Sequence, residues 1–172
     1  MKKIKVIIIV VVIALVSYPL YKVLYLGGIL PLAPNYAKME KYYNDNYEDL
    51  LYVSESLSNI NDETIILYKT QGSSLMYLSN TEDGRLGRNK SITDEKLTKI
   101  IQELFDRGTS TIRKKNDYII FTTWSSLNES RGVLYMLGSK KIEQDILDQD
   151  YIANLRALTR KGWYYYESYF DK

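Results

Sequence analysis

The chain has 172 residues, a length typical of one domain with an accessory segment. Apolar residues make up 45% and charged residues 26%, which indicates a folded rather than a disordered protein. The formal net charge is +2, but four lysines lie in or beside one hydrophobic segment: Lys2, Lys3, Lys5 and Lys22. The rest carries 19 basic and 21 acidic residues, so its charge of −2 gives no reason to expect a nucleic-acid partner.

The chain contains no Cys and no His. This excludes thiol nucleophiles, disulfides, thiolate zinc sites and imidazole acid–base catalysis. We therefore expect a protein without a metal or cofactor, and one that is not an enzyme. Tyrosine is abundant, with 17 copies, and suits half-buried strands and hydrated interfaces.

The segment Ile4–Leu26 is predicted to span a lipid bilayer. At about 1.5 Å per residue its length is roughly 34 Å, enough to cross the hydrocarbon core. The lysines before it favour a cytoplasmic N-terminus and a domain outside the cell membrane. A cleaved signal peptide is the alternative, although Leu15 and Ser17 make a poor cleavage site. The predicted organisation is an anchor at 1–28, a linker at 29–34 and a single extracytoplasmic domain at 35–172.

Within the domain, apolar spacing predicts each element. Apolar residues at spacings of three and four indicate a helix that begins after Asn35. We expect this helix to pack on its own domain, with a stalk or a dimer seam as alternatives. A second helix follows Thr93 and ends near Gly108. In chain order we expect a helix at 36–57, strands at 64–70 and 74–78, a polar loop at 80–89, a helix at 94–107, strands at 109–113, 118–124 and 132–137, a helix at 143–160, and an aromatic strand at 163–166.

The predicted fold class is α+β, with a largely antiparallel sheet of about five to six strands and packed helices. The order of elements resembles an extracytoplasmic PAS- or Cache-type sensor module in outline. Such modules also place a long helix after a membrane span, followed by a hairpin, a helical insert and three strands. The resemblance implies ligand sensing, but the last helix and strand are additional and the sequence contains no output domain.

The stretch 124–132 has the composition of a binding site. It combines an aromatic ring, hydroxyls, a carboxylate and a guanidinium around a predicted loop, although loop hydroxyls commonly satisfy local backbone groups instead. The aromatic residues at 163–166, with Tyr169 and Phe170, are the second candidate, since alternation in a strand would bury half of them and expose the rest. Plain packing in an edge or final strand of the sheet is the favoured alternative. The candidate binding residues are Trp124, Ser125, Ser126, Asn128, Arg131, Tyr135, Trp163 and Tyr165.

Two other stretches carry weaker patterns. Gly84–Lys90 combines glycines with three cations but lacks the spacing of a phosphate-binding loop, so we expect a solvated loop. The acidic residues at 143–150 do not have the spacing of a calcium-binding loop and fit a helix start.

The expected function is that of a membrane-anchored, non-catalytic bacterial envelope protein that binds a protein, peptide or cell-wall partner. One alternative is a small-ligand sensor or an accessory subunit of another membrane protein. A hydrolase that uses carboxylates alone is the second alternative.

Overall fold

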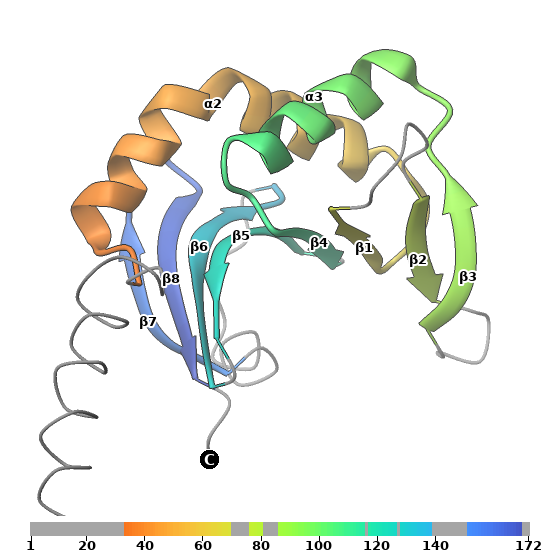
Figure 1. Ribbon diagram of the computed structural model, residues 1–172. Coiled ribbons are helices and arrows are strands. Elements are labelled where there is room, and N and C mark those ends of the chain that lie inside the picture. The colour runs from red at the N-terminus through yellow and green to blue at the C-terminus, as the bar shows by residue number, and fades with distance from the viewer. Residues whose placement is uncertain are drawn as a thin grey trace, which may run out of the picture. The chain divides into compact units, whose positions relative to one another are not determined.

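All eight described strands belong to one antiparallel sheet. The computed structural model describes residues 33–69, 76–80, 86–115, 117–126, 128–138 and 151–169. The elements in these residues are α2 (Tyr36–Ser58), β1 (Ile65–Tyr68), β2 (Met76–Asn80), β3 (Leu86–Ser91), α3 (Glu95–Asp106), β4 (Thr111–Lys115), β5 (Tyr118–Ser125), β6 (Glu129–Met136), β7 (Ile152–Ala157) and β8 (Trp163–Tyr169). The strand order is β3-β2-β1-β4-β5-β6-β8-β7, and both helices cover one face (Figure 1). The predicted α+β class and antiparallel sheet are confirmed, but the sheet has eight strands rather than five to six.

The additional strands lie at the two edges of the sheet. β3 begins in the predicted polar loop at 80–89 and continues to Ser91, and β7 forms within the predicted helix at 143–160. An edge strand pairs through its main chain on one side only, so it needs little apolar alternation in its sequence. In β7, Ile152 and Leu155 are three residues apart, a spacing that also fits a helix.

Some predictions fall on parts of the chain that the structure leaves undescribed. They are the membrane span at Ile4–Leu26, the connection between the predicted strands at 64–70 and 74–78, and the acidic stretch at 143–150. In the described ranges, no helix is both long enough and apolar enough to cross a membrane.

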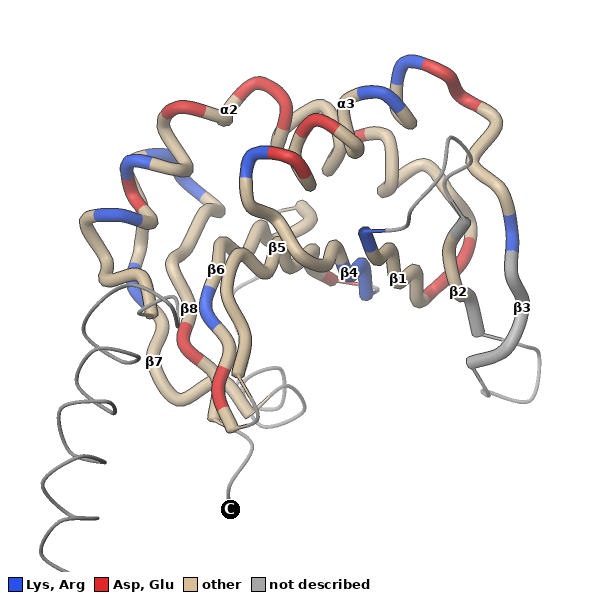
Figure 2. The backbone as a smooth tube through the Cα atoms, viewed as in Figure 1, with Lys and Arg blue, Asp and Glu red and all other residues tan. Residues whose placement is uncertain are grey.

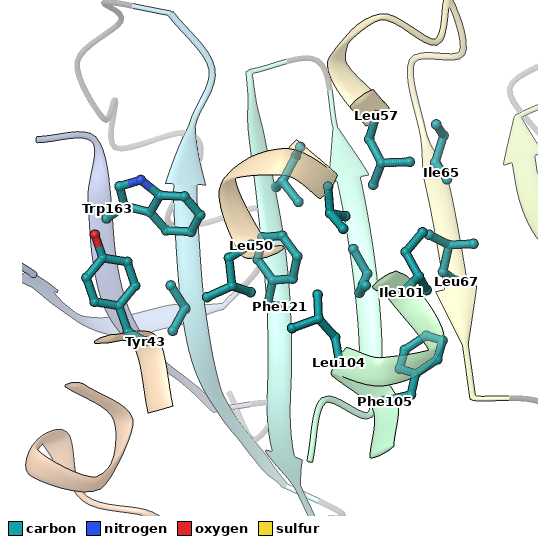
Figure 3. Close-up of a cluster of buried hydrophobic side chains, with 14 of the residues drawn as sticks. Tyr43, Leu50, Leu57, Ile65, Leu67, Ile101, Leu104, Phe105, Phe121 and Trp163 are labelled. Atoms are coloured by element: carbon teal, nitrogen blue, oxygen red, sulfur yellow. The ribbon is translucent and has the colours of Figure 1, made fainter. Parts of the chain in front are cut away.

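Helix α2 packs along its own sheet, as predicted. Asn35 caps its N-terminus, because the Asn35 side chain accepts a hydrogen bond of 3.0 Å from the backbone N–H of Lys38. Tyr43, Leu50 and Leu57 on the buried side of the helix join one hydrophobic core with α3 and the strands (Figure 3). Packing on the domain therefore accounts for the apolar stripe.

Helix α3 begins at Glu95, one residue later than a helix capped by Thr93 would begin. Its N-cap is Asp94, whose carboxylate accepts from the backbone N–H of Leu97 at 2.9 Å. At the other end, Gly108 has a φ of +113° and Thr109 N–H donates to the carbonyl of Leu104. This closes the helix with the glycine terminator that the sequence predicted.

Strand β8 is the last strand in sequence but lies inside the sheet, between β6 and β7. Trp163 and Tyr165 are buried on the face that carries the helices. Tyr166 is buried on the opposite face, in a second apolar cluster with Ile120 and Leu134. These three side chains therefore pack within the fold rather than form an exposed aromatic face, and their strand is internal rather than at an edge of the sheet.

Gly132 allows the close approach of β5, β6 and β8. A Cβ atom at this position would lie 2.0 Å from the carbonyl oxygen of Phe121 and 2.9 Å from the ring of Tyr166. The pairing of β5 with β6 shifts register between Thr122 and Trp124, next to this contact. Any larger residue at 132 would force these strands apart, so this glycine maintains the close spacing of the strands on both sides of the register shift.

A polar cluster holds the loop that joins α2 to β1. The Asp62 carboxylate accepts hydrogen bonds from the ammonium of Lys90 and the phenol of Tyr77. The buried ammonium of Lys114 donates to the carbonyls of Ile60 and Asp62. The hydrogen bond from Lys90 lowers the pKa of Asp62, whereas burial and the bond to Asp62 raise the pKa of Tyr77 to about 12.

We predict that Asp62→Asn destabilises the fold by about 1–3 kcal/mol at neutral pH, since a half-buried ammonium loses its charged acceptor. Because the pKa of Asp62 is lowered in the folded state, this contribution is complete above about pH 4 and is lost as pH falls through the folded pKa. Urea unfolding at a series of pH values measures it. Asp106→Asn, in an exposed pair with Lys69, is the control and should change little. A loss that persists unchanged at about pH 2 would contradict the account.

Candidate functional site

A cluster of charged and aromatic side chains surrounds Arg131 near the end of the β5–β6 hairpin. In the sheet register Arg131 lies opposite Glu167 of β8 and Trp124 of β5. Glu129 and Tyr169 form the next cross-strand pair. Because side chains alternate along a strand, the members on β6 and β8 share the face that α2 covers.

The Arg131 guanidinium lies between two carboxylates. Its Nη1 is 3.5 Å from Oε1 of Glu167, and its Nη2 is 3.6 Å from Oε2 of Glu129. The same Nη1 donates a hydrogen bond of 3.2 Å to the carbonyl of Pro34, just before α2. The guanidinium carbon also lies 5.8 Å from the ring centroid of Trp124. One residue thus connects β5, β6, β8 and the entry to α2.

Glu167 is fully engaged. It accepts hydrogen bonds from the phenols of Tyr165 and Tyr169 and from the amide of Asn154 on β7. Burial alone would raise the pKa of Glu167, but the bonds from Tyr165 and Asn154 and the charge of Arg131 outweigh it and lower the pKa. Burial and the bond to Glu167 raise the pKa of Tyr165. The carboxylate therefore stays ionised and the phenol stays neutral at physiological pH.

A hollow of about 400 Å³ lies beside this cluster, lined by Ser126, Asn128, Glu129 and Tyr169. The turn between β5 and β6 forms one wall, because Ser126 N–H donates to the carbonyl of Glu129 at 2.8 Å. The Ser126 hydroxyl accepts from the backbone N–H groups of Asn128 and Glu129. Ser126 thus shapes the turn, and its hydroxyl is already occupied by local backbone groups.

The predicted site residues separate into two groups. Trp124, Ser126, Asn128, Arg131 and Tyr165 lie around the Arg131 cluster and the hollow, and Ser125, the exposed last residue of β5, is adjacent. Tyr135 and Trp163 lie elsewhere: their rings stack at 4.5 Å beneath α2.

Three residues of the cluster and the hollow are not among the eight candidate binding residues: Glu129, Glu167 and Tyr169. Glu129 and Tyr169 belong to the two candidate stretches, whereas Glu167 belongs to neither. Glu129 was placed in a loop, but β6 begins there, three residues earlier than predicted. Glu167 and Tyr169 lie beyond the predicted end of the last strand at 166, whereas β8 continues to Tyr169. Extending that strand by period two would have placed both on the face of Tyr165.

A second hollow, of about 490 Å³, lies on α2 and the end of α3, and it is lined by Lys38, Lys41, Tyr42, Asp45, Asn46 and Arg107. Two of the three cations that line it have carboxylate partners in the fold: Arg107 pairs with Asp49 and Glu103, and Lys41 pairs with Asp45. Figure 2 shows that basic and acidic positions are interspersed along α2. These pairs reduce the attraction of this hollow for an anion, so the Arg131 cluster is the stronger candidate.

Comparison of this chain with protein-family models, curated proteins and solved structures finds no match. The likeness to PAS and Cache modules therefore stays a prediction from the order of the elements.

We predict that Arg131→Met lowers the free energy of unfolding by about 2–4 kcal/mol, because two half-buried carboxylates lose their common cation. Adding Glu167→Gln to this variant removes one of the uncompensated charges, so the double variant should lose less than the sum of the single variants. Urea unfolding of all four proteins in the cycle provides the measurement. Strict additivity would show that the Arg131–Glu167 pair contributes nothing.

Proposed function

We propose that this chain is a membrane-anchored, non-catalytic envelope protein whose domain binds a partner polypeptide at the hollow beside Arg131. The observation that carries the proposal is the fixed set of polar and aromatic side chains around that hollow. Internal contacts hold Arg131 and Glu167 in place, so the site has a defined shape before a partner arrives. Such preorganisation reduces the entropy lost on binding.

The anchor belongs to the proposal through the hydrophobic segment Ile4–Leu26. The domain follows that segment after a short linker, so it would face outward if the lysines keep the N-terminus inside. A partner at the cell surface is then the expected ligand class.

The protonation of the carboxylates supports binding rather than hydrolysis. A glycosidase of the usual kind needs one carboxylic acid whose pKa is raised, so that it can protonate the leaving group. The pKa of Glu167 is lowered instead, and its oxygens accept three hydrogen bonds. Glu167 is therefore suited to a fixed structural charge rather than to proton transfer.

A ligand sensor or accessory subunit is the second candidate, favoured by one contact. Arg131 neighbours Glu129 at the hollow and also holds the carbonyl of Pro34. Binding at the hollow would therefore reach the main chain that leads from the predicted anchor into α2.

The proposal is tested with a photo-crosslinking amino acid at Asn128 in the full-length chain, expressed in its native host. We expect a discrete adduct from Asn128 and none from the same group at Asp106, which is exposed on α3. Ser126→Trp, which fills the hollow, should abolish the adduct, while Asn59→Trp on the α2–β1 connection should preserve it. Identical adducts from both crosslinker positions, or an adduct that survives Ser126→Trp, would refute binding at this hollow.

A further inference from the structure

The two carboxylates of the Arg131 cluster differ in their hydrogen bonding. Glu167 accepts three hydrogen bonds from side chains. The carboxylate of Glu129 accepts none from the part of the chain that the structure describes, and its nearest cationic atom is Nη2 of Arg131 at 3.6 Å. That distance is longer than an ordinary N–H···O bond. Glu129 is thus a carboxylate with unused acceptor capacity.

The unused acceptor is located in the wall of the hollow. The side chain of Glu129 is only 24% exposed, so bulk water solvates it incompletely. Ser126, Asn128 and Tyr169 form the remaining wall. A donor that enters the hollow would meet Glu129 at short range, and a hydrogen bond between charged groups is stronger than one between neutral groups.

The net charge of the cluster indicates which charge a ligand should carry. Glu129 and Glu167 carry two negative charges, and Arg131 supplies one positive charge, so one negative charge is uncompensated. Three side-chain donors stabilise the charge of Glu167 within the fold, whereas the Glu129 carboxylate accepts no hydrogen bond from the described residues. An anion would be repelled from this carboxylate, whereas an ammonium or guanidinium group would complete its hydrogen bonding.

From these contacts we infer that the hollow takes the cationic side chain of a lysine or arginine on a partner polypeptide, with the Glu129 carboxylate as its acceptor. This inference rests on the proposed binding function and names the chemistry of the partner. A volume of about 400 Å³ accommodates a long side chain. Ser125, Ser126 and Asn128 are exposed around it, so the main chain of a polypeptide would meet polar groups there.

Fluorotryptophan gives the site its own spectroscopic reporter. The chain has two tryptophans: Trp124 stands beside Arg131, and Trp163 is buried beneath α2. The full-length protein in detergent micelles, labelled with 5-fluorotryptophan, should give one ¹⁹F resonance from each. A short peptide with a central lysine should shift the Trp124 resonance saturably and leave that of Trp163 unchanged. The same peptide with an acetylated lysine should not shift either resonance.

Two variants distinguish the effect of the Glu129 charge on binding from a general effect on the fold. Glu129→Gln keeps the size of the side chain and should weaken binding of the lysine peptide by about tenfold or more. Glu48→Gln makes the same change at an exposed position on α2 and should leave binding unchanged. Urea unfolding confirms that each variant is folded.

The outcomes distinguish this inference from the proposed function. Equal binding of the lysine and acetyl-lysine peptides, no saturable shift with the lysine peptide, or full affinity in Glu129→Gln would each overturn the cationic ligand. If butylamine binds as tightly as the lysine peptide, the inference that the cation belongs to a polypeptide is overturned. An adduct at Asn128 in cells, blocked by Ser126→Trp, would keep the binding function in all of these cases.

Discussion

Trp163 packs between helix α2 and the centre of the sheet, and the position of the candidate site follows from that contact. Its ring stacks on Tyr135 of β6 at 4.5 Å and lies 5.3 Å from Tyr43 of α2. This packing favours one register of β8 against β6, in which Trp163 faces Tyr135 and Glu167 faces Arg131. A shift of this register by one residue would move Glu167 to the opposite face of the sheet and separate it from Arg131. The aromatic core and the polar site are therefore consequences of the same register.

The close approach at Gly132 is a second condition for this arrangement. It brings β5, β6 and β8 together next to Arg131, and the register shift after Thr122 brings Trp124 opposite that arginine. Arg131 then reaches Pro34 and links the sheet to the start of α2. The proposed binding hollow is consequently built on strands and a tight turn rather than on a long loop, which favours a precise geometry.

Strong local patterns allowed most of the fold to be predicted from the sequence. The apolar stripe of α3, the glycine terminator at Gly108 and the apolar run of β5 each indicate one structure, and the fold confirms them. The edge strands β3 and β7 were missed because main-chain pairing determines them and leaves little trace in side-chain spacing.

The candidate site was predictable only in part. The composition of the stretch around Trp124 and Arg131 indicates a candidate site. Its cross-strand neighbours, such as Glu167, are determined by the register of the strands, which the sequence alone does not specify. Trp163 and Tyr135 were assigned to a binding face because large aromatic rings suit both interfaces and cores. Their position beneath α2 shows that packing determined their role.

We propose that the domain, with its open hollow, faces outward from the membrane. Because the chain contains no Cys, Ser126→Cys introduces a single thiol at the exposed rim of that hollow. We expect a membrane-impermeant maleimide to label this variant on intact cells, whereas Val53→Cys, on the buried side of α2, should react only after denaturation. Labelling of Ser126→Cys only after cell lysis would place the domain inside the cell and contradict the account.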